Sequence, residues 1–297
     1  MGVDAGGSHT AAAISRADFA ILGRAEGPGA PLRPGGAAAT AAAVAEVSNR
    51  AARVADIPLP VERAVVGAAG AGRAQERHDL RVALAAHGLA RLVEVVADGE
   101  IALAAVFGTE PGILVNAGTG SIAYARDRQG RLRRSGGYGW QLGDAGGGYW
   151  IGRRALAEAA KARDRMGEGT LLARVLAALG LREFDELVRW AATASPSQVA
   201  SLAPRVFSAA ADGDPAAQRI TAEAAQELVE LALVVEPMFS PDDPVLLATG
   251  GGLLTPASPL YVAFSERLVS ALPRVRLVEI RPDPPIGALR LAANFGV

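Results

Sequence analysis

The chain has 297 residues, which is more than one hydrophobic core usually supports, so two domains are expected. Its 30 basic and 31 acidic residues leave a formal net charge of -1, which provides no general attraction to nucleic acid or to an anionic membrane. The absence of cysteine excludes disulfides, thiolate zinc sites and protein-ligated iron–sulfur clusters, and no apolar run is long enough for a membrane span. We therefore expect a small-molecule ligand and a cytoplasmic location, with no nucleic-acid or membrane partner.

The first third of the chain has the pattern of one layered α/β domain. Short β-rich segments separated by Gly or charged turns open it, an Ala-rich stretch with helical composition follows, and strands and helices then alternate. The expected strands are 1–4, 11–15, 19–25, 63–67 and 92–97, and the expected helices are 37–55 and 79–87. This order predicts helices packed on a sheet.

The same pattern then starts again. Strands are expected at 112–116 and 122–126 with a Gly turn between them, and the letters VDAG at 3–6 match VNAG at 115–118. A strand–turn–strand unit repeated at domain spacing favours two similar lobes. Residues 149–239 are mostly helical, with Asp214-Pro215 opening a long helix. A strand at 245–248 and a last helix at 286–294 complete the expected elements.

The first Gly turn, Asp4-Ala5-Gly6-Gly7-Ser8-His9-Thr10, has the chemistry of a phosphate site. Glycines let backbone N–H groups approach phosphate oxygens, Ser8 and Thr10 can donate hydrogen bonds, and Asp4 at a strand end can orient hydrated Mg²⁺. An ordinary hairpin turn explains this segment equally well, because Gly-rich turns are common.

Two further turns repeat this chemistry. Asn116 to Ser121 reads NAGTGS, and Gly250-Gly251-Gly252 follows another apolar strand. None of the three turns is a Walker phosphate loop, because no Gly-Lys-Ser/Thr follows, and none has the dinucleotide fingerprint. If two lobes face each other, the first two turns would bind phosphates from opposite sides, and the third would lie near the adenosine.

Five blocks together resemble the N-acetylglucosamine kinase and BadF-type branch of the actin-like ATPases. They are VDAGGSHT at 3–10, GAAGAGR at 67–73, VVADGEIAL at 95–103, NAGTGS at 116–121 and GGYGWQLGDAGGGYWIG at 136–152. The resemblance covers nearly the whole chain. It implies two actin-like (ribonuclease H-like) α/β lobes around a nucleotide cleft, the second enlarged by helices. The expected domains are 1–108 with the C-terminal helix of about 286–297, and 109–285.

The resemblance also implies roles for individual residues. Asp98 matches the catalytic carboxylate, which accepts the proton of the sugar hydroxyl and contacts the sugar. A helix N-cap is the alternative role for this aspartate. The other sugar-contacting positions are Gly137, Tyr138, Gly139 and Asp144. The expected ATP and phosphate contacts are Asp4, Gly6, Gly7, Ser8, Thr10, Gly118, Thr119, Gly120, Gly213, Gly251 and Gly252, with Asp4 reaching Mg²⁺ through water.

Departures from the family pattern affect the substrate. Relatives usually carry Asn where this chain has Ala30, and often read Gly-Asp-Glu-Gly-Ser where it has Ala145 after Asp144. One sugar-binding amide and one carboxylate are therefore missing. Met1 lies only three residues before Asp4, which favours a translation start upstream.

The expected activity is ATP-dependent transfer of the γ-phosphate to a hydroxyl, by resemblance the 6-hydroxyl, of N-acetylglucosamine, glucosamine or a related hexose, with ATP and Mg²⁺ as cofactors. A homodimer is left open. The alternatives are an ATPase activator of a dehydratase or reductase, which the lack of cysteine disfavours, a non-catalytic sugar-sensing relative, and a hexokinase of broader range.

Overall fold

The protein is described by a computed structural model that covers residues 1–165, 170–241 and 243–294. The chain divides into two compact units, each with its own sheet. The first unit contains residues 1–110 and 281–297, and the second contains 111–280. Among the described residues, no helix has both the length and the apolar surface that crossing a lipid bilayer requires.

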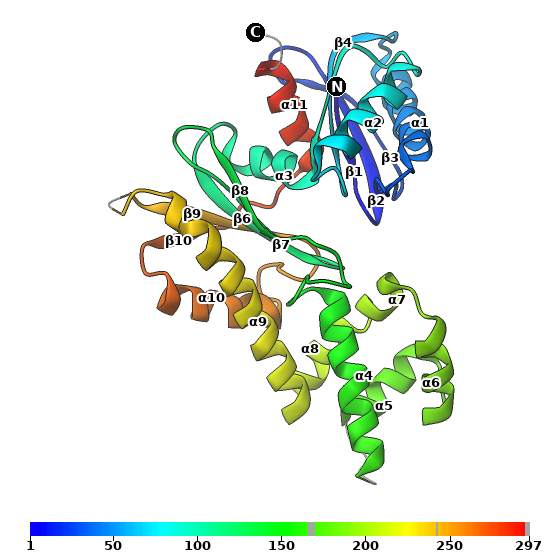
Figure 1. The fold of residues 1–297 in the computed structure, drawn as a ribbon, viewed down its shortest axis with the longest axis vertical. Coiled ribbons are helices and arrows are strands. Elements are labelled where there is room, and N and C mark those ends of the chain that lie inside the picture. The colour runs from blue at the N-terminus through cyan, green and yellow to red at the C-terminus, as the bar shows by residue number, and fades with distance from the viewer. Residues whose placement is uncertain (166–169, 242, 295–297) are drawn as a thin grey trace. The chain divides into compact units, whose positions relative to one another are not determined.

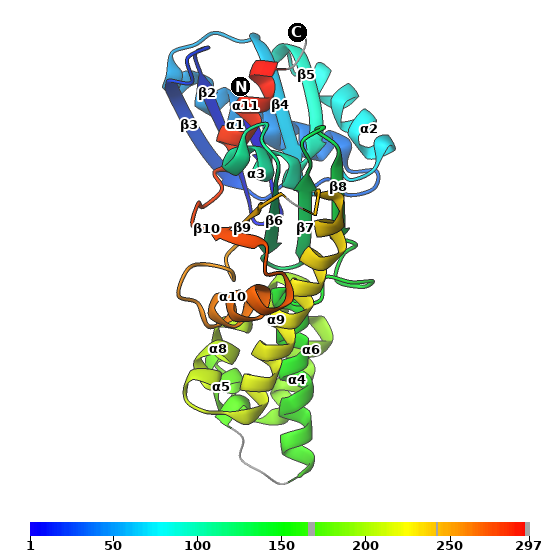
Figure 2. The same ribbon diagram turned by 90° about the vertical axis from the view of Figure 1, so that its left-hand side faces the viewer.

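The sheet of the first unit has the strand order β3-β2-β1-β4-β5 (Figures 1 and 2). Its strands are β1 (Gly2–Ala5), β2 (His9–Ser15), β3 (Ile21–Pro28), β4 (Val61–Ala68) and β5 (Ala90–Ala97). The first three strands form an antiparallel meander, and β4 and β5 run parallel to β1. The carboxyl ends of β1, β4 and β5 therefore meet at one edge of the sheet.

Helices cover both faces of this sheet. They are α1 (Ala37–Ala55), α2 (Ala74–Ala85), α3 (Asp98–Phe107) and α11 (Pro284–Asn294). In α1 the buried residues recur every three or four positions, as in Thr40, Val44 and Val47, so one stripe faces the core with α2. On the opposite face Ile101 of α3 packs with Val65 and with Ala288 of α11.

The sheet of the second unit repeats this order as β8-β7-β6-β9-β10. Its strands are β6 (Gly112–Ala117), β7 (Ser121–Arg126), β8 (Leu132–Gly136), β9 (Val245–Gly250) and β10 (Val275–Val278). The pairing repeats as well, because β6 to β8 form an antiparallel meander and β9 runs parallel to β6 and to β10. This equivalence confirms the repeat seen in the letters VDAG and VNAG.

A layer of helices belongs to the second unit. It comprises α4 (Gly148–Asp164), α5 (Thr170–Leu179), α6 (Phe184–Thr193), α7 (Pro196–Ala200), α8 (Ala203–Ala211), α9 (Pro215–Val235), the 3₁₀ turn η1 (Glu236–Met238) and α10 (Pro259–Ala271). One hydrophobic core joins these helices to the sheet, and it includes Ile151 of α4, Leu228 of α9 and Phe264 of α10. The enlargement of the second lobe by helices is therefore confirmed.

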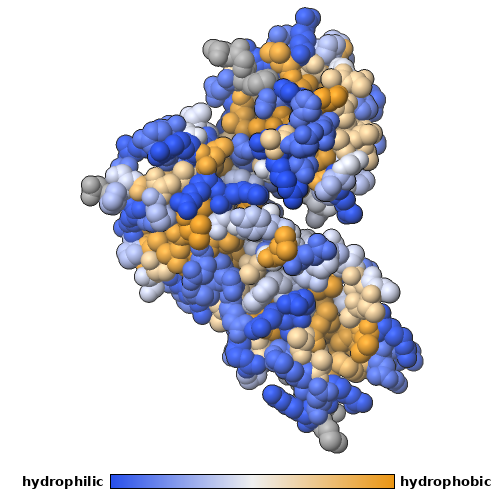
Figure 3. Space-filling view, in the orientation of Figure 1, coloured by the Kyte–Doolittle hydropathy of each residue, from blue (hydrophilic) through white to orange (hydrophobic). Residues whose placement is uncertain are grey.

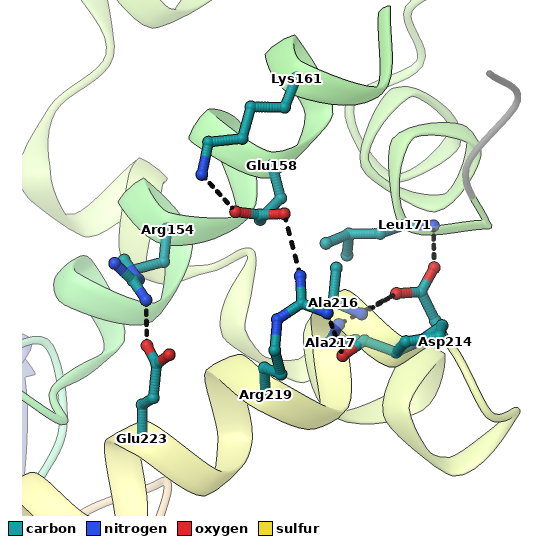
Figure 4. A network of polar contacts seen from close by, with 10 residues as sticks. Arg154, Glu158, Lys161, Leu171, Asp214, Ala216, Ala217, Arg219 and Glu223 are labelled. Carbon is teal, nitrogen blue, oxygen red and sulfur yellow. Dashed lines mark hydrogen bonds and ion pairs between the residues drawn. The ribbon is translucent and has the colours of Figure 1, made fainter. Parts of the chain in front are cut away.

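Asp214 ties the start of α9 to α5 (Figure 4). Its carboxylate accepts the backbone N–H groups of Ala216 and Ala217, at 2.9 and 3.0 Å, and that of Leu171 at 3.0 Å. The side chain is 8% exposed, so it satisfies donors that water reaches poorly. On the outer surface, Glu158 pairs with Lys161 and Arg219, and Arg154 pairs with Glu223.

The surfaces of both units mix polar and apolar residues in the view of Figure 3. Exposed large apolar side chains occur singly over most of the chain, as normal for a globular protein. Three of them are close in sequence, however. Tyr138, Trp140 and Leu142 are 61%, 43% and 85% exposed, and all lie in the loop that follows β8.

Candidate active site

The first Gly turn joins β1 to β2 in the first unit. Gly6 N–H donates to the His9 carbonyl at 3.0 Å and closes the turn, which leaves Gly7 and Ser8 exposed. The loop after β3 is fixed to this turn, because Ala30 N–H donates to the Gly6 carbonyl at 3.1 Å. The exposed backbone and the Ser8 hydroxyl can therefore contact phosphate.

Thr10 is the one hydroxyl of this segment that the structure does not bring to the turn surface. It is fully buried and lies opposite Ala5, so its side chain is on the sheet face that packs against α1. No partner among the described residues bonds its hydroxyl. We therefore leave Thr10 out of the proposed phosphate contacts.

The structure brings Asp4 and Asp98 together. Asp4 lies opposite Gly67 of β4, which in turn lies opposite Val96 of β5, and Asp98 begins α3 two residues later. Gly67 is required by close packing, because a Cβ there would overlap the side chain of Ile101. Because Gly67 has no side chain, β4 places no side chain between the carboxylates of Asp4 and Asp98.

The electrostatics of the first unit agree with this proximity. The pKa of Asp4 is raised from 3.8 to about 7, first by burial and second by the negative charge of Asp98. His9 lies on the other side, with its Nε2 at 3.8 Å from Asp4 Oδ2, but its own side chain is mostly exposed. Asp98 accepts the N–H of Gly99 at 2.9 Å, and Glu100 accepts the N–H of Ala97 at 3.2 Å. Glu100 thus binds the backbone donor that precedes the helix, and Asp98 binds the donor of the residue that follows it.

The second Gly turn joins β6 to β7 and rests on the start of α4. Gly118 N–H donates to the Gly120 carbonyl at 2.9 Å, and the Gly118 carbonyl accepts the N–H of Gly148 at 2.8 Å. The Thr119 carbonyl accepts the N–H of Tyr149 at 2.9 Å. The first donors of α4 are therefore used to fix the turn, while Thr119 itself stays partly exposed.

Asp144 fastens the loop after β8 to this turn. Its Oδ1 accepts the N–H of Gly139 at 3.2 Å, and its Oδ2 lies against Gly120, where a Cβ would overlap it. Ser121 Oγ adds a bond to the Ala145 carbonyl at 2.6 Å. Partial burial raises the pKa of Asp144, while hydrogen bonds from Gly139 and Tyr138 oppose that shift.

The remaining Gly positions differ in what they could contact. Gly251 has a φ of 81° and sits against Ala117, next to the second turn, whereas Gly252 faces open space. Gly213 is not brought to either turn, because it lies between α8 and α9, just before the Asp214 cap. The part of α9 that reaches the loop after β8 is Ala224, whose carbonyl lies against Gly146, and Ala224 is about 14 Å along the helix from its start at Pro215.

Two contacts near the loop were not foreseen from the sequence. The guanidinium of Arg134, on β8, lies over the Tyr138 ring at 5.3 Å from its centroid, and Trp140 packs on Tyr149 with ring centroids 4.9 Å apart. The sequence signal that could have predicted the Arg134 contact is its position two residues before Gly136, on the strand that leads into the loop.

Two surface cavities of the protein lie away from the Gly turns and from the loop after β8. A cavity of about 290 Å³ is lined by the β7–β8 turn and by Met238 and Phe239, and another of about 360 Å³ lies at the edge of the first unit near Met1 and Phe19. Neither is lined by a Gly turn or by the loop after β8. The candidate site therefore rests on side-chain and backbone geometry.

Comparison with known proteins agrees with these features. The family model described as the BadF/BadG/BcrA/BcrD ATPase family matches residues 1–292. The N-acetylmuramic acid/N-acetylglucosamine kinase of Clostridium acetobutylicum is 36% identical over 233 residues, which are 77% of this chain and 76% of that protein.

Solved structures extend the similarity to the whole fold. A candidate N-acetylglucosamine kinase from Chromobacterium violaceum is 28% identical with a TM-score of 0.80, covering 98% of this chain and 97% of that one. A ROK family glucokinase from Streptomyces griseus, solved with glucose and AMPPNP, has a TM-score of 0.59 at 19% identity, covering 99% and 98%, and so shows the fold alone. The actin-like α/β fold is thereby confirmed. The family model covers almost the whole chain, so the chain belongs to the BadF/BadG/BcrA/BcrD ATPase family.

Proposed function

We propose that the protein is an ATP-dependent kinase that transfers the γ-phosphate to a hydroxyl, specifically the 6-hydroxyl, of N-acetylglucosamine or a close amino-sugar relative. The similar protein of C. acetobutylicum is named for both N-acetylmuramic acid and N-acetylglucosamine, which supports an amino sugar as the acceptor. The observation that carries the proposal is the pair of carboxylates, Asp4 and Asp98, beside the first Gly turn.

In this proposal Asp98 is the general base. It begins a helix directly after a parallel strand, and Glu100 rather than Asp98 accepts the N–H of Ala97. A carboxylate in that position accepts the proton of the sugar hydroxyl as the hydroxyl oxygen attacks the γ-phosphorus and the bond to the β-phosphate oxygen breaks. The Gly turn at 6–8 offers backbone N–H groups to phosphate oxygens in the first unit, and the Gly turn at 118–120 offers the same groups in the second.

Asp4 fits a role beside Mg²⁺. It is a buried carboxylate whose pKa is raised to about 7, next to a second carboxylate, and a divalent cation would favour its charged form. Among the described residues no three acidic or histidine side chains gather around one point, which suits an ion held mainly by nucleotide phosphates. When bound, Mg²⁺ neutralises charge on those phosphates.

The sugar is proposed to lie against the loop after β8. Asp144 offers carboxylate oxygens to hydroxyl groups, and Gly139 faces open space beside the exposed Tyr138 ring, whereas Gly137 packs on Ile122 and shapes the loop. Because the same loop is bonded to the turn at 118–121, a bound sugar and a bound phosphate would touch one connected piece of backbone.

The test is substitution of the proposed base. Asp98→Asn keeps the shape of the side chain and removes its basicity, so kcat for N-acetylglucosamine should fall at least roughly a hundredfold. Nucleotide affinity should stay within a few-fold of wild type, since it depends on the Gly turns and the metal ion. Asp79→Asn, an exposed aspartate of the same unit, is the matched control and should leave kcat unchanged.

Near-normal kcat in Asp98→Asn, at an unchanged melting temperature, would show that the base lies elsewhere. If the wild type binds an amino sugar and ATP but phosphorylates none of a panel of hexoses and amino sugars, the sensing alternative replaces the kinase.

A further inference from the structure

Arg134 is a cation beside the proposed sugar site, and none of the acidic residues that the structure describes forms an ion pair with it. The two arginines in the turn of the same hairpin are both paired, Arg131 with Asp127 at 2.6 Å and Arg128 with Asp243 at 2.9 Å. For Arg134, no carboxylate of residues 1–165, 170–241 or 243–294 forms an ion pair with the guanidinium, and its contact is the ring of Tyr138.

The position of this pair is fixed by the backbone. Arg134 lies on β8, directly across from Tyr124 of β7, on the sheet face opposite to the one that carries Ser135. Gly136 and Gly137 then turn the chain with positive φ values of 75° and 69°, and Gly137 N–H donates to the Ser121 carbonyl at 3.0 Å. Tyr138 is therefore held over Arg134 by the chain itself.

The arrangement leaves donors available. The contact of the Arg134 guanidinium with the Tyr138 ring is a cation–π contact at 5.3 Å and not a hydrogen bond, so it does not use the N–H donors of the guanidinium. The acceptor that matches two parallel N–H groups is a carboxylate, which a neutral sugar does not carry. Tyr138 is 61% exposed, so a sugar lying on its open side would bring its substituents near this edge.

We propose that Arg134 determines specificity at the sugar site and that it selects an amino sugar bearing a carboxylate, such as one with a lactyl ether on its ring, over the neutral sugar. This rests on the proposed function, since it names the substrate class of that same site. Arg134 would also offset the negative charge that Asp144, which accepts the N–H of Gly139 in the same loop, presents to an anionic ligand.

The experiment compares two substrates of nearly equal shape, N-acetylmuramic acid and its lactyl methyl ester, which lacks the negative charge. Binding is measured by calorimetry and turnover by ATP consumption, for wild type, Arg134→Gln and Arg133→Gln. The control removes the same charge from the neighbouring, exposed residue of β8, whose side chain is on the opposite face of the strand from Arg134.

Wild type should prefer the acid over the ester by about tenfold, because a charge-assisted bidentate bond is strong but here partly exposed to water. Arg134→Gln should abolish that preference, and Arg133→Gln should keep it. Equal preference in wild type and Arg134→Gln overturns the proposal, and so does an Arg134→Gln variant that changes only the KM for ATP, because the guanidinium would then belong to the nucleotide.

Failure of this inference differs from failure of the proposed function. Phosphorylation of both sugars without preference would leave a kinase and remove the role of Arg134. A preference seen in binding and lost in Arg134→Gln, with no phosphorylation of either sugar, would support the recognition of the acid and reject the kinase. If neither sugar binds to wild type, the inference is wrong.

Discussion

Gly120→Ala tests whether Asp144 really fastens the sugar loop to the second Gly turn. A Cβ at position 120 would overlap Asp144 Oδ2 and lie 2.8 Å from Asp144 Cγ, closer than carbon atoms approach without contact strain. The carboxylate cannot simply rotate away, because its Oδ1 accepts the N–H of Gly139 at 3.2 Å. Either the turn or the carboxylate must move.

The cost can be estimated from these contacts. Overpacking of a filled site costs about 1–3 kcal/mol, and losing the hydrogen bond to Gly139 adds about 0.5–1.5 kcal/mol. A total of roughly 2–4 kcal/mol lowers the melting temperature of a unit of this size by about 4–16 °C. The KM values for ATP and for the sugar should rise together, because the turn and the loop share the displaced side chain.

Thermal unfolding and kinetics are measured for Gly120→Ala, Gly118→Ala, Asp144→Ala and the variant that combines Gly120→Ala with Asp144→Ala. Gly118→Ala is the matched control, since a Cβ there meets nothing within 4 Å, and its melting temperature should equal that of wild type. In an Asp144→Ala background the cost of Gly120→Ala should shrink by at least about 1 kcal/mol, since the clash is gone. Equal stability of the Gly118 and Gly120 variants, or additive costs in the double variant, would refute the fastening role.

Three further outcomes follow from single contacts. Asp4 binds a proton in the folded protein between pH 3.8 and about 7 that it lacks when unfolded, so stability falls as pH rises through that window. Asp4→Asn should therefore raise the unfolding free energy by on the order of 2–4 kcal/mol at pH 8 and by little at pH 4, and a pH-independent difference in denaturant titrations would contradict this. Asp214→Ala should lower the unfolding free energy by about 2–4 kcal/mol, because three backbone donors lose their acceptor. Ser195 caps only the five-residue α7, so Ser195→Ala should lower the unfolding free energy by about 1 kcal/mol or less. Similar melting temperatures of the two variants would exclude the anchoring role of Asp214. Ala30→Asn should raise kcat/KM for an N-acetylated amino hexose about 2- to 10-fold by restoring an amide beside the first turn, and no gain with any sugar would show that this loop has another role.

Local sequence signals predicted most of the elements. The Ala-rich stretch forms α1 over Ala37–Ala55, as expected, because its apolar positions recur with helical spacing. The Asp214-Pro215 pair begins α9, where the side chain caps the helix and proline occupies the first turn. The second expected helix, 79–87, is instead Ala74–Ala85, since its weakly apolar sequence marks neither end clearly.

Long-range contacts were beyond the reach of sequence patterns. The basic run at Arg131 to Arg134 has the composition of a solvated turn, but the turn ends at Arg131 and β8 begins at Leu132. That strand is defined by pairing with β7, which no local spacing reports. The proximity of Asp4 to Asp98 likewise depends on the parallel order of β1, β4 and β5. Conversely, the alternation of side chains along β2 could have predicted the position of Thr10. Its hydroxyl is on the same sheet face as Ala5, away from the turn.

The position of α11 bears on the order in which the chain acquires structure during synthesis. The second unit is one continuous segment, so all of its core residues have been translated once Ile280 is made. The first unit needs α11 to cover Val65 and Ile101, and α11 begins only at Pro284. The half that leaves the ribosome first is therefore the half that finishes folding last. A nascent chain stalled before Pro284 already contains most of the sequence of the first unit. It should nevertheless expose to chaperones the apolar side chains that α11 covers, Val65 and Ile101.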